Sequence, residues 1–324
     1  MTSFVTEHIN HIYPQLLSSV LYSSEVSPRG LKTREALGIS ILFTNPEANL
    51  LVSPGRNLNY SFMLAEWVNL LLGVNLLDVL LPYNSNMQHF SDDGRTLSGS
   101  YAPKLNMQWA YLLESLREPS TRQAVVTFWE RNPRRSRDIP CTISLQFLLR
   151  EGKLNLITTM RSNDLWWGFP YDIFNFTQLQ RYVAMKLEVP VGWYLHQVGS
   201  LHLYEQHFDI AKEVAHNETV IWDPTSEPLT PMPQGFAACF LALSLMLKDQ
   251  NYHVDPQGWI NEVAPGMEQP WQDYLRVLAY KFTRNTDGMS DYWQCLVTHG
   301  LTQWPVTTPL PRTMVPHLRG NKDG

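Results

Sequence analysis

Apolar and polar residues alternate with two different periods in the first third of the chain. Residues 36–53 alternate and end in turn residues, a pattern that predicts strands. Residues 59–73 instead place apolar side chains at helical spacing and stop at Gly73, a residue typical of a helix end. The sequence therefore predicts a helix here, and this apolar helix contains one carboxylate, Glu66.

Strand and helix patterns continue along the rest of the chain. Segments rich in β-branched and aromatic residues predict strands at 123–129, 142–150, 153–160 and 192–204. Helical spacing predicts helices at 105–117, 174–187, 206–216, 235–249, 269–284 and 288–299, and the polar, Gly/Ser-rich segment 84–104 predicts a loop. We therefore expect an α+β fold, with a core at 1–221 and a helical extension at 222–324 that follows a Pro-rich stretch.

Composition narrows the class of protein. The 324 residues are 44% hydrophobic and 17% charged, as in globular proteins. A net charge of −5 provides no broad basic field, so we expect no nucleic-acid partner, and the short basic run 131–137 is read as a solvated loop or a patch for a small anion. The start of the chain does not resemble a signal peptide, so we expect the protein in the cytoplasm. The sequence has no run of about 18 apolar residues, so we expect no membrane association. It has no C-x-x-C pair, so we expect no metal site.

Cys141 is the first candidate for chemistry. It follows Pro140 and opens a strand-like run after a polar loop. A cysteine thiolate attacks electron-poor carbon well once a nearby arginine lowers its pKa. The alternative is a buried, unreactive cysteine.

Polar and aromatic residues gather at 161–172. Arg161 and Ser162 are followed by an asparagine and by Asp164, and then by two tryptophans, a glycine and a proline. Polar donors beside flat aromatic rings suit an aromatic ligand that carries a phosphate, although a strand end followed by a turn has the same composition. Further on, His202 and Tyr204 are two apart in a predicted strand and hence on one face, where two neutral donors suit a sugar hydroxyl; a lone histidine is more often structural.

Three motifs together resemble the thymidylate synthase superfamily. They are P-C-T-I-S-L-Q-F around Cys141, R-S-N-D-x-x-x-G-F-P-Y-D at 161–172 and V-G-S-L-H-L-Y at 198–204, in the family's order and spacing. The resemblance extends over residues 25–220, and within the family it is greatest to the deoxycytidylate 5-hydroxymethylases of phages. It implies a thymidylate synthase-like mixed sheet with packed helices, a pyrimidine nucleoside monophosphate as substrate, and 5,10-methylenetetrahydrofolate as cofactor.

The resemblance also implies a role for each matched position. Cys141 would add to C6 of the pyrimidine, Glu66 would order water and proton transfers, and Tyr101 would be an active-site tyrosine. Arg161 and Ser162 would bind the phosphate, with Arg29 as a mobile clamp. Arg122 would contact the phosphate bound by a partner subunit, which implies a homodimer. His202 and Tyr204 would bind the ribose, and Asp164, Trp167 and Gly168 would bind the folate.

Asp172 and three departures from the synthases indicate which pyrimidine base is bound and which product is formed. Thymidylate synthases carry Asn at this position, and a carboxylate facing O4 of uracil would be repulsive, whereas cytosine offers an amino group. The loop 84–104 lacks the synthases' tryptophans, Thr142 replaces their histidine, and Gln123 replaces a second arginine. Asp172 favours a cytosine nucleotide and the missing tryptophans favour addition of water, so we expect a dCMP 5-hydroxymethyltransferase. The alternatives are CMP hydroxymethylation, C5 methylation of dCMP or dUMP, and an inactive nucleotide-binding relative.

Overall fold

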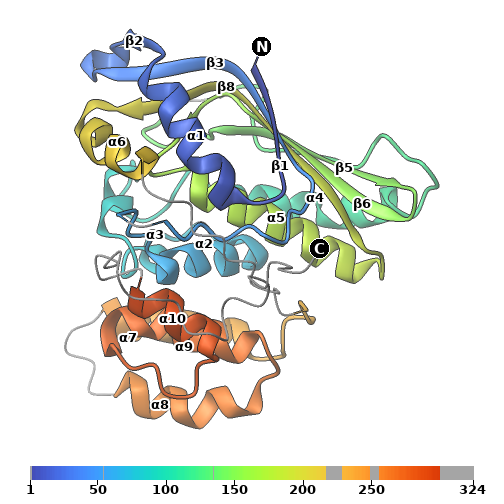
Figure 1. The fold of residues 1–324 in the computed structure, drawn as a ribbon. Coiled ribbons are helices and arrows are strands. Elements are labelled where there is room, and N and C mark those ends of the chain that lie inside the picture. The colour runs from blue at the N-terminus through green and yellow to red at the C-terminus, as the bar shows by residue number, and fades with distance from the viewer. Residues whose placement is uncertain (1, 54, 134, 217–227, 249–254, 300–324) are drawn as a thin grey trace, which may run out of the picture.

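One mixed sheet forms the centre of the molecule. The computed structural model describes residues 2–53, 55–133, 135–216, 228–248 and 255–299. The strands run in the spatial order β1-β3-β8-β6-β5-β4, with β2 beside β3 and β7 beside β8. Their bounds are β1 (Thr2–Thr6), β2 (Ser24–Val26), β3 (Thr33–Phe43), β4 (Val125–Thr127), β5 (Thr142–Arg150), β6 (Lys153–Met160), β7 (Asn163–Asp164) and β8 (Val191–Tyr204). With helices packed against this sheet, the predicted α+β fold is confirmed (Figure 1).

The helices form two layers beyond the sheet. Helices α1 and α5 contact the sheet directly, and α2 packs against α4 and α5 on one side and against α9 on the other. This double contact explains why α2 is apolar nearly all round. The bounds are α1 (Ile9–Leu21), α2 (Tyr60–Leu72), α3 (Leu77–Leu80), α4 (Tyr101–Ser115), α5 (Phe169–Lys186), α6 (Phe208–His216), α7 (Phe236–Lys248), α8 (Pro256–Val263), α9 (Trp271–Thr283) and α10 (Asp291–His299). Short 3₁₀ turns are η1 (Pro28–Gly30), η2 (Ser85–His89), η3 (Glu205–His207) and η4 (Ala264–Gly266).

The β5–β6 hairpin has the predicted bounds because its turn chemistry is explicit. Glu151 and Gly152 join the two strands with φ of 51° and 72°. Two positive φ values are what a type I′ turn requires, and this turn matches the twist of the flanking strands. The hairpin thereby fixes the register of β5, the strand that directly follows Cys141.

The C-terminal helices pack on the far side of α2 and α3 from the sheet (Figure 1). Ser61 Oγ of α2 donates to the carbonyl of Val277 in α9 at 2.6 Å. Lys281 Nζ donates to the carbonyl of Tyr83. The first bond joins the helical layer to α2, the helix that carries Glu66, and the second joins it to the segment after α3. The predicted boundary at 221/222 lies outside the described residues.

Some predicted bounds are wrong. Residues 44–53 form no strand, because the Asn10 side chain takes the place of a ladder partner by donating to the Leu50 carbonyl and accepting from the Val52 amide. The loop predicted at 84–104 contains η2 and the start of α4, and the helix predicted at 174–187 begins at Phe169. Helices α1 and α8 were not predicted from the sequence.

Strand β8 changes its buried face at Gly199. Up to Val198 the even-numbered side chains are buried, and from Leu201 onward the odd-numbered ones are. Gly38, with φ of 65°, lies opposite on β3, between the paired positions Leu37 and Ile39. A Cβ at Gly199 would lie 2.9 Å from the carbonyl oxygen of Arg161, so glycine is required for this close approach.

Candidate active site

Cys141 lies at the start of β5 beside a guanidinium. Arg161, directly after β6, places Nη2 3.7 Å from the Cys141 sulfur. The same side chain donates to the carbonyl oxygens of Pro140 at 2.9 Å and Ile139 at 3.0 Å, and its guanidinium lies over the ring of Trp129. Arg161 is therefore held against the segment that presents the thiol.

The pKa of the Cys141 thiol differs from the sequence expectation. Burial raises it above its ordinary value, the Arg161 charge lowers it, and the carboxyl groups of Asp172, Asp138 and Asp164 raise it further. The predicted arginine is in place, but its effect on the pKa is smaller than that of burial. An anion beside Cys141 would compete for the same guanidinium, so the charge around the thiol depends on what is bound.

Tyr101 is hydrogen-bonded to the first residue of β5. As the first residue of α4 it accepts a hydrogen bond at its hydroxyl from the backbone N–H of Thr142, at 3.2 Å. Its ring packs against Phe128 and Phe176. Burial raises the pKa of Tyr101 well above 10, with a further contribution from Asp172 and the nearby thiol. The phenol therefore stays protonated and next to the candidate nucleophile.

The loop before α4 is tied to the segment that leads to Cys141. Asp138 accepts from the backbone N–H of Gly99 at 2.7 Å. Asp92 accepts from the Ser136 hydroxyl at 2.6 Å and from the backbone N–H of Arg137 at 3.1 Å. These bonds tie the loop 84–104, which lacks the tryptophans of the synthases, to residues 136–138 shortly before Cys141.

Asp172 and Glu66 are two partly buried residues whose carboxyl groups interact. Asp172 lies in the first turn of α5, and its pKa is raised by burial to about 7, despite a hydrogen bond from Asn163. The pKa of Glu66 on α2 is raised to about 8, first by burial and then by the charge of Asp172. Near neutral pH this pair holds at least one proton, and groups with such pKa values are suited to proton transfer.

A row of hydrogen bonds runs from the core to Asp172. Asn163 Nδ2 donates to Asp172 Oδ2 at 2.7 Å, and Asn163 Oδ1 lies 2.9 Å from His196 Nε2. His196 Nδ1 lies 2.8 Å from the Tyr194 hydroxyl. The sequence prediction gave no role to these three residues. Asn163 was visible only as a letter of the R-S-N-D motif, and Tyr194 and His196 follow ordinary strand alternation.

Asp164 closes a tight turn with an aromatic surface. Its Oδ1 accepts from the backbone N–H groups of Trp166 at 2.7 Å and Trp167 at 3.0 Å. Trp167 is 51% exposed, and the ring of His207 lies against both tryptophans. Arg56, also absent from the sequence prediction, lies over the Trp166 ring and donates to its carbonyl. A half-exposed indole beside a fixed carboxylate fits a planar, hydrogen-bonding ring such as a pterin.

The predicted sugar-binding residues lie together on one face after the Gly199 change. The rings of His202 and Tyr204 meet edge to face with centroids 5.2 Å apart, and Ser162 Oγ lies 3.4 Å from His202 Nδ1. All three side chains are partly exposed. Their roles stay predictions.

Two predicted phosphate ligands lie apart from this group. Arg29 is exposed in η1 with φ of 55°, and Arg122 is exposed before β4. In the part of the chain that the structure describes, neither guanidinium forms an ion pair or hydrogen bond. The structure therefore brings together Cys141, Arg161 and the acidic pair, and leaves these two arginines free to meet a ligand or another subunit.

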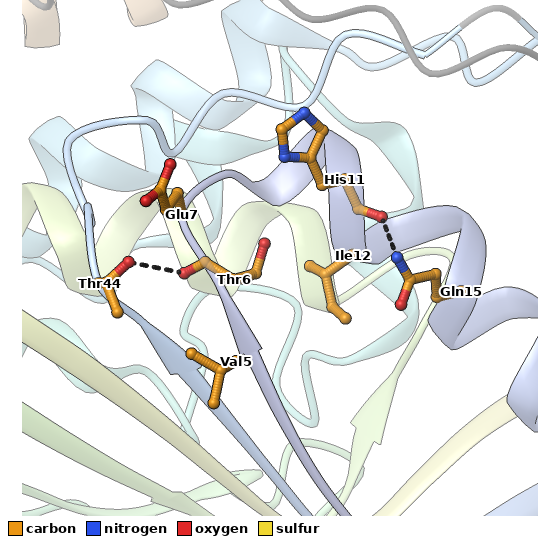
Figure 2. Close-up of a pocket in the computed structure, with 7 residues that line it drawn as sticks. All are labelled: Val5, Thr6, Glu7, His11, Ile12, Gln15 and Thr44. Atoms are coloured by element: carbon orange, nitrogen blue, oxygen red, sulfur yellow. Dashed lines mark hydrogen bonds between the residues drawn. The ribbon is translucent and has the colours of Figure 1, made fainter.

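A surface hollow elsewhere lacks such chemistry. Figure 2 shows it between β1 and α1, lined by Val5, Thr6, Glu7, His11, Ile12, Gln15 and Thr44. The drawn hydrogen bonds are local: Thr44 to the Thr6 carbonyl and Gln15 to the His11 carbonyl. Strands β3, β8 and β6 separate β1 from β5, so this hollow is distinct from the Cys141 site.

Two absences apply to the described residues alone. Within the ranges given above, no three or more His, Cys, Asp and Glu side chains are grouped so as to hold a metal ion. None of the helices in those ranges has both the length and the apolar character needed to cross a bilayer.

Known proteins match this fold and these motifs. A thymidylate synthase family model matches residues 81–226. A deoxyuridylate hydroxymethyltransferase of Bacillus phage SP01 is 33% identical over 72% of this chain and 70% of that protein, and one of Pseudomonas phage M6 is 26% identical over 79% and 75%. The thermostable thymidylate synthase A of Bacillus subtilis superposes with a TM-score of 0.56 at 21% identity, covering 66% of this chain and 86% of that one.

The chain belongs to the thymidylate synthase family. It is accordingly a one-carbon transferase of pyrimidine nucleotide metabolism.

Proposed function

We propose that the protein hydroxymethylates C5 of a pyrimidine deoxynucleoside monophosphate, with dCMP as the substrate. The observation that carries the choice of base is Asp172, a partly buried residue whose carboxyl group acts electrostatically on both Cys141 and Glu66. A carboxyl group accepts from the amino group of cytosine and shares a proton with N3. Such a charge-assisted pair contributes about 1.5–3 kcal/mol.

The residues have distinct tasks in this reaction. The Cys141 thiolate adds to C6, which places negative charge on the N3/C4 edge of the ring, next to Asp172. Arg161 binds the phosphate with Ser162, and His202 and Tyr204 hold the ribose. After the one-carbon unit has joined C5, the C5 proton is lost and the folate amine leaves, which gives an exocyclic methylene. Water then adds to that carbon, with Glu66 as the proton-transfer group. Expulsion of the Cys141 sulfur from C6 then restores the ring double bond.

The folate is proposed from the residues around Trp167. Asp164 keeps Oδ2 available while Oδ1 binds the turn, and Trp167 with Gly168 offers a flat surface. When bound there, 5,10-methylenetetrahydrofolate supplies the one-carbon unit. The chain's own contribution is to bind and orient it beside Cys141.

A second candidate substrate is dUMP. Both phage relatives are named deoxyuridylate hydroxymethyltransferases. In addition, an Asp172 carboxyl with a pKa near 7 is partly protonated at neutral pH, and a neutral acid donates to O4 of uracil. The base is therefore a direct experimental question.

The test uses dCMP, dUMP and CMP separately, each with methylenetetrahydrofolate in oxygen-18 water, and weighs the nucleotide product. We expect heavy oxygen in 5-hydroxymethyl-dCMP and the highest kcat/KM for dCMP. A 5-methyl product with dihydrofolate would make the protein a methylating synthase, and a preference for dUMP would select the second candidate. Ser162→Ala should narrow the gap between dCMP and CMP, by roughly 10- to 200-fold.

We also propose a homodimer formed through the open face of the sheet. One register row on that face runs Val5, Leu42, Leu195, Ile157, Gln146 and Val125 from β1 to β4. Val5 is 70% exposed, and the next three are partly exposed apolar side chains. An exposed apolar patch of this kind is typical of a surface that another protein buries. A second copy would bury it and would bring Arg122 to the neighbouring phosphate site. Sedimentation of Leu195→Asp should give a monomer where the unmutated protein gives a dimer.

A further inference from the structure

Three buried side chains connect the middle of the sheet to Asp172. Tyr194 and His196 of β8 are fully buried, and Asn163 of β7 is 2% exposed. The hydrogen bonds are Tyr194 to His196 at 2.8 Å, His196 to Asn163 at 2.9 Å and Asn163 to Asp172 Oδ2 at 2.7 Å. We call Tyr194, His196 and Asn163 the buried relay.

The chemistry of its members gives the relay one direction. Burial lowers the pKa of His196 to about 3, so the imidazole is neutral and carries one proton. Since the Asn163 nitrogen faces the carboxyl group, its oxygen faces His196, and the imidazole proton must be on Nε2. Nδ1 is then an acceptor, and the Tyr194 hydroxyl donates to it. Every bond in the relay therefore donates toward Asp172.

This direction decides which oxygen of Asp172 carries a proton. Oδ2 is engaged as an acceptor, so a proton on the carboxyl group belongs on Oδ1. Cytosine requires the proton on the oxygen that faces N3, and uracil requires it on the oxygen that faces the 4-position. A neutral carboxyl group free to choose would accept both bases.

We infer that Tyr194, His196 and Asn163 are positioning residues that keep Oδ2 free of a proton, so that Asp172 pairs with one pyrimidine base and discriminates against the other. The inference rests on the proposed function in one respect, that the base meets Asp172. The inference is the same whether the protein prefers dCMP or dUMP.

Local packing is built around the last bond of the relay. A Cβ on Gly168 would lie 2.9 Å from Asn163 Nδ2 and 3.3 Å from Asp172 Oδ2, so only glycine leaves this bond undisturbed. The Phe169 ring meets the His196 ring edge to face, with centroids 5.4 Å apart. Gly168 and Phe169 thus pack closely around the Asn163 amide and the His196 ring.

The test compares kcat/KM for dCMP and dUMP in relay variants. In Tyr194→Phe, His196 is free to move its proton to Nδ1 and Asn163 to turn its amide, so the ratio of the two values should move toward one by about tenfold, the usual worth of one net hydrogen bond. His196→Leu should act in the same direction. His196→Gln keeps an N–H donor toward Asn163 and should retain most of the ratio, which a merely structural role would not predict.

Tyr60→Phe is the matched control. It also removes a buried tyrosine hydroxyl, one that donates to the Leu51 carbonyl at 2.9 Å outside the relay. Its base ratio should equal that of the unmutated protein. An unchanged ratio in both Tyr194→Phe and His196→Leu would overturn the inference, as would a loss of the same size in Tyr60→Phe.

A second measurement does not depend on turnover or on the stability of variants. Nitrogen-15 NMR of histidine-labelled, unmutated protein should show His196 as the neutral Nε2–H form throughout pH 6 to 8. An Nδ1–H form or an imidazolium would overturn the relay's direction. If the unmutated protein turned over neither nucleotide, the proposed function would fail, and calorimetric affinities of dCMP and dUMP in the same variants would judge the relay separately.

Discussion

Replacing Asp172 by Asn should stabilise the protein, and more so at higher pH. The carboxyl group ionises at about pH 7 in the folded chain, against an ordinary value of 3.8, because burial disfavours its charge. A raised carboxyl pKa means that the folded chain binds more protons than the unfolded chain between these two values, so stability falls as pH rises through this window. At about 1.4 kcal/mol per pH unit, the cost of Asp172 reaches about 4 kcal/mol at pH 8 but only about 2 kcal/mol at pH 5.

The assay is urea unfolding of both proteins at pH 5 and pH 8. The stability gained by Asp172→Asn should grow by about 2–3 kcal/mol between these pH values, and any pH-independent change in the bond to Asn163 cancels in that difference. Asp209→Asn is the matched control, because Asp209 also lies in the first turn of a helix but is 95% exposed. A gain that is the same at both pH values would refute the reasoning, since Asp172 would then ionise as it does in water.

Three further changes test the site and its support. Cys141→Ser should fold but lose turnover by roughly 10³-fold or more, because a hydroxyl is far less ionised than a thiol, and mass spectrometry should find no adduct with a 5-fluoropyrimidine nucleotide; normal turnover would contradict the mechanism. Gly168→Ala should cost about 1–3 kcal/mol in chemical unfolding, because the new methyl group overlaps Asn163 Nδ2, and an unchanged midpoint would show that the turn relaxes freely. Ser61→Ala should lower stability by about 1 kcal/mol by removing the bond to Val277, with kcat unchanged; a large fall in kcat would mean that the helical layer controls the site.

Local patterns predicted the segments whose own residues determine their structure. The β5–β6 hairpin has its predicted bounds because Glu151 and Gly152 form the turn within two residues. Helix α2 was predicted from the helical spacing of its apolar residues and from Gly73, which ends it with φ of 71°. The strand prediction for residues 44–53 was wrong because backbone groups of Leu50 and Val52 bond to the side chain of Asn10. Asn10 is 40 positions away from Leu50, and sequence periodicity contains no information about such a partner.

The candidate site divides in the same way. Cys141, Arg161 and Asp172 were predicted because each lies in a motif, and the structure brings all three together. His196 was not predicted, because its role depends on facing Asn163 across two strands. The pKa of Cys141 was misjudged, since burial of a thiol is a property of the packed fold and its effect is larger than that of the neighbouring charge.

The change of face at Gly199 lets one strand act on two sides of the sheet. Before it, His196 points into the core toward Asn163, and after it, His202 and Tyr204 lie on the more exposed face. A strand without this change would place His196 and His202 on the same face, because they are an even number of residues apart. Residues proposed to act on the base and residues predicted to bind the sugar are thus in one continuous strand but in separate packing environments. Selectivity for the base and selectivity for the sugar can therefore be altered independently, by substitutions on opposite sides of a single glycine.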